Sequence, residues 1–159
     1  MTRIRWCTGL FLLLVHLLPL GAHAQLGPRS GDSALAGSQQ RPLPVEQAFP
    51  WFVSIDGPGR VSVTWQPAPE HYLYRHQFHF TLLPGNDGPP FSLAFELPDG
   101  VRKTDEFFGD IEAYYEPVKA SLQLDPGLIS GARLEIRFQG CADWGFCYPP
   151  HQVIVPLQP

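Results

Sequence analysis

FPWFVSIDGPGRVSVTWQ, residues 49–66, is the stretch that decides the fold class of this chain. In its second half Val61, Val63 and Trp65 alternate with polar residues, which is the period-two pattern of a half-buried β-strand. Its first half, 49–55, is another apolar run, and the DGPG between the two is a typical turn sequence. The stretch therefore predicts a β-hairpin.

Outward from this hairpin the chain continues as short strand-like segments separated by Gly and Pro turns. Further segments of this kind lie at 71–83, 91–98, 117–124, 132–139 and 151–157. In a strand over 71–83, alternate residues from Tyr72 to Phe80 share one face. No stretch has a convincing helical stripe of apolar residues. The pattern predicts an all-β fold of seven or eight strands, an immunoglobulin-like antiparallel β-sandwich.

The N-terminus has the features of a secretory signal peptide. Two arginines precede an apolar run from Leu10 to Leu20, and AHA at 22–24 has the small-x-small pattern of a cleavage site. The run is shorter than the roughly 20 apolar residues of a membrane helix. We therefore expect residues 1–24 to be removed, Cys7 among them, and the product to enter an oxidising compartment.

The rest of the chain is expected to form a leader and one domain. Residues 25–43 are rich in Gly, Ser, Gln and Pro and lack apolar periodicity, which predicts a flexible leader. The domain is expected over residues 44–159, with order beginning near Val45 or Phe49.

A formal net charge of −4 gives no indication of a nucleic-acid surface, which is usually basic. No later segment has the length of a membrane helix, so we expect a product that does not span the membrane.

Cys141 and Cys147 lie in GCADWGFCYPP, residues 140–150, between two predicted strands and thus at the rim of the sandwich. In an oxidising compartment they are expected to form a disulfide. A loop this short stabilises a fold by only about 2 kcal/mol, less than a long-range crosslink. The pair is not C-x-x-C and no βαβ pattern surrounds it, which argues against a thioredoxin-like domain. On these residues alone, a redox-active pair and a structural disulfide remain equally open.

Two other stretches contain candidate site residues. TDEFFGD, residues 104–110, lacks periodicity and is expected to be a loop, either a solvated turn or a lid over a reactive disulfide. In HYLYR, 71–75, Tyr72 and Tyr74 share a strand face, either as core residues with a solvated hydroxyl or as neighbours of the cysteine loop. The scattered histidines lack metal-ligand spacing, so no metal site is expected.

Together these stretches resemble the N-terminal periplasmic domain of the DsbD family of thiol:disulfide interchange proteins. The likeness rests on VEQAFP, HYLYR, DEFFGD and GCADWGFCYPP in this order, and it spans residues 43–157. It implies a periplasmic immunoglobulin-like redox domain that uses no cofactor of its own. It also implies an electron donor in the form of a membrane-embedded thiol reductant, and acceptors among thioredoxin-like proteins such as disulfide isomerases and cytochrome c maturation proteins.

The resemblance also implies roles for individual residues. Cys141 and Cys147 match the catalytic redox pair, with Cys147 forming mixed disulfides with partners and Cys141 resolving them. The cap loop of the family matches Asp105, Glu106, Phe107, Phe108 and Gly109, and Phe107 is the expected shield over the disulfide. The residues expected to line the site are Tyr72, Tyr74, Trp144, Phe146 and Tyr148.

Two differences from the family pattern keep an alternative open. Trp144 lies inside the cysteine loop, where family members often carry a smaller residue, so we expect the surface around the loop to fit partner proteins differently. The membrane and C-terminal domains of the full-length family are not in this sequence, which is either a stand-alone version or a fragment. The leading hypothesis is an oxidoreductase module that depends on a separate electron donor. The alternative is a non-catalytic immunoglobulin-like binding domain with a structural disulfide.

Overall fold

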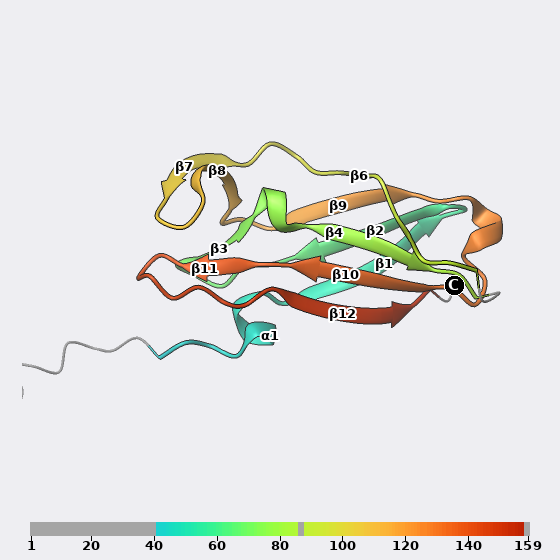
Figure 1. Cartoon of the computed structure of the whole chain (residues 1–159), viewed down its shortest axis with the longest axis horizontal. Helices are drawn as coiled ribbons and strands as arrows, with labels where there is room; N and C mark the ends of the chain where they lie inside the picture. The colour runs from blue at the N-terminus through green and yellow to red at the C-terminus, as the bar shows by residue number, and fades with distance from the viewer. Residues whose placement is uncertain (1–40, 86–87, 158–159) are drawn as a thin grey trace, which may run out of the picture. The chain divides into compact units, whose positions relative to one another are not determined.

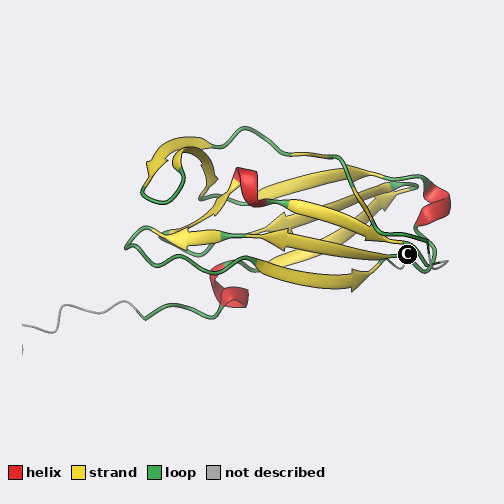
Figure 2. Ribbon diagram, viewed as in Figure 1, coloured by secondary structure: helices red, strands yellow, loops and turns green. Residues whose placement is uncertain are grey.

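The computed structural model describes residues 41–85 and 88–157. The expected signal peptide, 1–24, and all but the last three residues of the expected leader, 25–43, lie outside these ranges. Within them the chain is nearly all β (Figure 2). One turn of α-helix, α1 (Val45–Ala48), precedes the first strand, and two 3-10 helices, η1 (Arg75–Gln77) and η2 (Pro126–Leu128), lie between strands.

In the described residues the strands form three four-stranded sheets, and every strand pair is antiparallel (Figure 1). The first sheet has the order β1 (Trp51–Gly57), β2 (Arg60–Trp65), β9 (Val118–Gln123) and β6 (Phe95–Glu96). The second has the order β12 (His151–Pro156), β10 (Arg133–Phe138), β4 (His79–Leu83) and β5 (Phe91–Ser92). The third has the order β11 (Gly140–Ala142), β3 (His71–Tyr74), β8 (Gly109–Tyr114) and β7 (Val101–Asp105).

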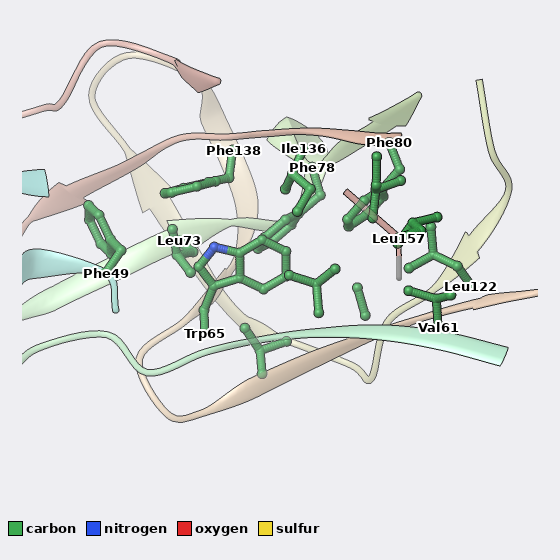
Figure 3. Packing of buried hydrophobic residues seen from close by; sticks show 14 of the residues in the cluster. Phe49, Val61, Trp65, Leu73, Phe78, Phe80, Leu122, Ile136, Phe138 and Leu157 are labelled. Atoms are coloured by element: carbon green, nitrogen blue, oxygen red, sulfur yellow. The ribbon is translucent and has the colours of Figure 1, made fainter. Parts of the chain in front are cut away.

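The first and second sheets pack face to face around the main hydrophobic core. Trp65 of β2 lies in the middle of this core, with its ring 4.7 Å from that of Phe78 and 5.6 Å from that of Phe138 (Figure 3). The alternating Val61 and Val63 of β2 are also buried. Each buried side chain of this kind stabilises the fold by about 1.5–3 kcal/mol. The expected immunoglobulin-like antiparallel β-sandwich is confirmed.

The third sheet extends one end of the second sheet and holds a separate small core. β11 follows β10 after Gln139, and β3 is joined to β4 through η1. Leu73 of β3 still packs into the main core. Tyr72 and Tyr74, its neighbours on either side, instead pack with Cys141 in the small core. β3 therefore contributes side chains to both cores, to the main core of the sandwich through one face and to the small core beside Cys141 through the other.

The prediction of one continuous strand over 71–83 is wrong. The turn η1 interrupts it and changes which residues face the main core, because a one-residue shift of register moves side chains to the other face. Tyr74 before the turn lies in the small core, whereas Phe78 after it lies in the main core. Arg75 holds the turn in place by donating hydrogen bonds to the carbonyl of Pro98 and to the Tyr114 hydroxyl.

Two other predicted segments are corrected as well. The expected strand over 91–98 is two strands of two residues, because the chain crosses there from β4 in the second sheet to β9 in the first. The expected loop over 104–110 is the end of a β-hairpin, in which Asp105 pairs with Gly109 and only residues 106–108 form the tip. Gly109 has a φ of 69°, a left-handed conformation that glycine adopts at little cost.

Candidate redox site

Cys141 and Cys147 form a disulfide at the end of the third sheet. Their Cα atoms are 4.0 Å apart, and the two residues face each other as an antiparallel bridge. The loop between them is closed by a hydrogen bond from the Ala142 N–H to the Phe146 carbonyl, 2.8 Å. Outside it, the Tyr148 N–H donates to the Gly140 carbonyl, 3.0 Å. The disulfide thus links β11 to the segment that leads to β12.

The two sulfurs differ in their access to solvent. Cys141 is 1% exposed and lies in register with Tyr72 of β3, in the interior of the small core. Cys147 is half-buried and packs against the same core from its margin. Thiol–disulfide exchange requires that a partner sulfur reach one of the two sulfurs in line with the bond. The greater exposure of Cys147 therefore favours attack by a partner thiolate at the Cys147 sulfur.

The Tyr74 hydroxyl contacts the disulfide directly. Its Oη lies 2.8 Å from the Cys141 Sγ and 3.7 Å from the Cys147 Sγ, and it donates a hydrogen bond of 2.9 Å to the Asp105 carboxylate. Burial is the main cause that raises the pKa of Tyr74 to about 12, so the hydroxyl keeps its proton at neutral pH. A protonated hydroxyl at this position can donate to a thiolate when the disulfide is reduced.

Asp105 connects the tyrosines to the tip of the β7–β8 hairpin. Its Oδ2 accepts hydrogen bonds from Tyr72, 2.7 Å, and Tyr74, 2.9 Å, while its Oδ1 accepts from the N–H groups of Phe107, 2.9 Å, and Phe108, 3.1 Å. Burial alone would raise the pKa of Asp105, but these four hydrogen bonds outweigh it and hold the pKa below its usual value. Asp105 is therefore a carboxylate, and it fixes the hairpin tip over the small core.

The two aromatic residues at the hairpin tip lie in different surroundings. The Phe108 ring packs 5.0 Å from that of Tyr74 and 4.9 Å from that of His76. Phe107 is 59% exposed and lines a hollow of about 420 Å³. Cys147 and Glu106 line the same hollow. The tip thus places the Phe108 ring on Tyr74 and the Phe107 ring at the hollow that Cys147 also lines.

The remaining predicted site residues lie in the cysteine loop or directly after it. Trp144 lines the hollow and stacks on Phe146, with ring centroids 5.7 Å apart. Phe146 packs against the main core, and Tyr148 is buried in it, 5.1 Å from the ring of Phe49. The Tyr148 hydroxyl also lies 3.2 Å from the His71 Nε2. Trp144 therefore borders the approach to Cys147, while Phe146 and Tyr148 anchor the loop.

Three residues that the sequence analysis did not single out also belong to this region. The Lys103 ammonium lies 2.8 Å from the Tyr115 hydroxyl and 3.3 Å from the Asp143 carboxylate, and 3.7 Å above the ring of Tyr72. Lys103 precedes Asp105 by two residues in β7, so period-two alternation would have placed both on one face. The sequence analysis missed this spacing because it did not identify 101–105 as a strand.

Three further observations concern the site and the described part of the chain. A larger hollow of about 1050 Å³ is lined by Arg75, Phe95 and Phe108 among others, but neither cysteine borders it, so we place the site at the smaller hollow. Within residues 41–85 and 88–157, no group of three or more His, Cys, Asp or Glu could hold a metal ion. The same residues include no helix long and apolar enough to cross a membrane.

Comparison with known proteins identifies the family. Residues 39–159 match the family model described as thiol:disulfide interchange protein DsbD, N-terminal. This chain belongs to that family.

Curated relatives within the family are longer than this chain. Over 151 residues the chain is 35% identical to DsbD of Yersinia enterocolitica serotype O:8 / biotype 1B and 37% identical to DsbD 2 of Pseudomonas aeruginosa. These alignments cover 93% of this chain but 25% and 23% of the two relatives. The chain thus spans about a quarter of the length of the curated relatives that it matches.

Solved structures of related domains have the same fold. The reduced N-terminal domain of DsbD from Neisseria meningitidis has a TM-score of 0.59 at 24% identity, covering 74% of this chain and 90% of that one. A complex between the DsbD N-terminal and PilB N-terminal domains of the same organism includes a chain with a TM-score of 0.59 at 25% identity. That match covers 71% of this chain and 84% of the other.

Proposed function

We propose that this chain is a periplasmic thiol–disulfide exchange module that passes two electrons through Cys141 and Cys147 to partner disulfides. The observation that carries the proposal is the unequal access of the two sulfurs, with Cys147 half-buried at a hollow and Cys141 buried against Tyr74. Exchange needs one sulfur that a partner can reach and a second that resolves the mixed disulfide. This arrangement supplies both.

The proposed sequence of steps is balanced between dithiols and disulfides. In the reduced module the Cys147 thiolate attacks a partner disulfide, and one partner sulfur leaves as a thiolate and takes up a proton. Cys141 then attacks the Cys147 sulfur of the mixed disulfide, which forms the Cys141–Cys147 bond and releases the second partner thiol. The partner gains two electrons and two protons. The module needs no cofactor for these steps, but it needs a dithiol donor to reduce it again.

The cap residues, Asp105 to Gly109, are proposed to control access to the pair. Phe107 at the hollow is the proposed shield against nonspecific thiols, and Asp105 holds the tip closed through its bonds to Tyr72 and Tyr74. Partner docking would move the tip and open Cys147. Trp144, which borders the same hollow, would then contact the docked partner.

The proposed acceptors are periplasmic thioredoxin-like proteins, among them disulfide isomerases and proteins of cytochrome c maturation. The proposed donor is a membrane-embedded thiol reductant. The complex of a related DsbD N-terminal domain with a PilB N-terminal domain supports protein partners for this kind of domain. The signal-peptide features of residues 1–24 support a location in the periplasm.

Trapping of a mixed disulfide tests this proposal. The Cys141→Ser chain, reduced and mixed with an oxidised thioredoxin-like protein, is expected to accumulate a covalent complex through Cys147, because the resolving thiol is missing. The Cys147→Ser chain is the matched control and should form little complex, since its remaining thiol is buried. The proposal is contradicted if Cys141→Ser forms no complex, or if both variants form it equally.

A further inference from the structure

A closed triangle of polar contacts lies beside the redox site. Lys103 Nζ donates to the Tyr115 hydroxyl, 2.8 Å, and to the Asp143 Oδ1, 3.3 Å. The Tyr115 hydroxyl in turn donates to the same Asp143 oxygen, 2.7 Å. Burial lowers the pKa of Lys103, but the hydrogen bonds to Tyr115 and Asp143 and the nearby Tyr72 outweigh it, so the pKa is raised and the group is an ammonium ion.

The triangle joins the two edge strands of the third sheet. Lys103 lies in β7, whereas Asp143 directly follows β11, and the sheet order places β3 and β8 between these strands. Neighbouring strands are about 4.8 Å apart, so the edges of a flat four-stranded sheet would be roughly 14 Å apart. The 3.3 Å contact between the two side chains therefore links strands that are not neighbours in the sheet, and Figure 1 shows the curl of β7 and β8.

The triangle also lies between the β7–β8 hairpin and the cysteine loop, which would move apart in the proposed docking step. Lys103 is two residues from Asp105, which anchors the hairpin tip, and Asp143 is two residues from Cys141. Both residues line the hollow that leads to Cys147. In addition, the ammonium lies 3.7 Å above the ring of Tyr72, whose hydroxyl bonds to Asp105. A cation held over an aromatic ring stabilises both groups in place.

We propose that Lys103 is a positioning residue for disulfide exchange, which clamps the β7–β8 hairpin to the cysteine loop through Asp143 and Tyr115 and so limits access to Cys147. The inference rests on the proposed function, because access matters only if the disulfide exchanges. The clamp acts on the base of the hairpin, and Phe107 acts at its tip. Releasing the clamp should let small thiols reach Cys147 more often.

The rate at which dithiothreitol reduces the Cys141–Cys147 disulfide tests the clamp. The two thiols of the reagent become its cyclic disulfide, and the cysteines take up two electrons and two protons. Asp143→Asn and Lys103→Met should each raise this rate by about two- to tenfold, the size expected for loss of an exposed ion pair and a cation–π contact. Lys103→Arg should stay near the unsubstituted rate.

A second ion pair in the same chain provides the control. Lys119 Nζ lies 2.8 Å from the Asp56 carboxylate, on strands of the first sheet away from the cysteines. Lys119→Met removes an equivalent pair and should leave the rate unchanged. In the double variant Lys103→Met/Asp143→Asn, the rate should be no higher than in the faster single variant, because both substitutions break one contact.

The possible outcomes separate the clamp from the proposed function. Unchanged rates in Asp143→Asn and Lys103→Met, with a faster Phe107→Ala chain, would overturn the clamp and leave the shielded exchange site intact. A slower Lys103→Met chain with unchanged Asp143→Asn would also overturn it, since the ammonium would then act by attracting the thiolate. Failure of Cys147 to form a mixed disulfide in the trapping experiment would instead overturn the proposed function.

Discussion

At the scale of single residues, the chemistry of the site depends on Tyr74, because its hydroxyl lies between a carboxylate and a sulfur. It has one proton and two kinds of acceptor, the Asp105 oxygen at 2.9 Å and the Cys141 sulfur at 2.8 Å. In the disulfide the sulfur is a weak acceptor, so the proton belongs to Asp105. A thiolate at Cys141 would be a much stronger acceptor.

Replacing Tyr74 with Phe should raise the pKa of the Cys141 thiol in the reduced chain, because the thiolate loses a hydrogen-bond donor. The ultraviolet absorbance of the thiolate, followed against pH in a Cys147→Ser background, measures this pKa. Tyr72→Phe is the matched control, since it also removes a hydrogen bond to Asp105. Equal pKa values in Tyr74→Phe and Tyr72→Phe would contradict a direct role of the Tyr74 hydroxyl.

Asp105 should make the stability of the domain dependent on acid pH. Its pKa is lower in the folded chain than its ordinary value of 3.8, so its contribution is complete above that value and is lost as pH falls through the folded pKa. Asp105→Asn should lower the free energy of unfolding by about 1–3 kcal/mol at neutral pH, the cost of weakening buried hydrogen bonds to a charged group.

Urea unfolding of both chains across this pH range measures the effect. The difference between the original chain and Asp105→Asn should begin to shrink below about pH 4, where the unfolded chain takes up the proton, and should be lost below the folded pKa, where the carboxyl is protonated in both states. A difference that stays constant down to the most acid pH at which the domain folds would contradict the account of Asp105 as a hydrogen-bonded carboxylate.

At the scale of elements, the β7–β8 hairpin brings the cap residues to the cysteine pair. Asp105 ends β7 and Gly109 begins β8, and the tip between them is held by the N–H groups of Phe107 and Phe108 on the Asp105 side chain. The Phe108 ring also packs on the rings of Tyr74 and His76. We expect so short a tip to move without disturbing the strands behind it.

Phe107→Ala should leave the fold intact and speed the reaction of the disulfide with small thiols, because the ring lines the hollow that leads to Cys147. Since Phe107 is already 59% exposed, its loss should change the free energy of unfolding by less than about 0.5 kcal/mol. Phe52→Ala is the control, because the Phe52 side chain in β1 is also exposed but does not belong to the site. If both variants react at the original rate, Phe107 does not shield the pair.

The sequence revealed the strands with clear alternation of buried and exposed residues and missed β7 and β8, for physical reasons. The alternation of Val61, Val63 and Trp65 is visible because one face of β2 is buried along its length. In β7 and β8 the alternation is weak, since charged residues such as Lys103 and Asp105 occupy the buried face of a polar site. The contact of Tyr74 with Cys141 joins residues far apart in the chain, and only the folded topology brings them together.

At the scale of the whole molecule, the sandwich core and the redox site are separate structures. The main core contains Trp65, Phe80 and Phe138, and the small core contains Tyr72, Tyr74 and Cys141. The disulfide spans six positions of sequence and closes a loop at the end of the third sheet. We therefore expect the sandwich to fold without it.

Replacing both cysteines with serine should preserve the fold and lower the free energy of unfolding by about 2 kcal/mol, as expected for a short loop. Circular dichroism and urea unfolding of the double variant test this. Treating the unsubstituted chain with reductant should reproduce the loss. A double variant that does not fold would show that the pair is a structural staple and would weaken the case for exchange.

The reduction potential of the Cys141–Cys147 couple tests the central claim most directly. The chain is equilibrated in glutathione or dithiothreitol buffers, and the fractions of dithiol and disulfide are measured. Exchange-active pairs have potentials of about −120 to −270 mV, whereas structural disulfides of secreted proteins lie below about −300 mV. We expect a value in the exchange range. A value below about −300 mV would contradict the account and favour an immunoglobulin-like binding domain with a structural disulfide.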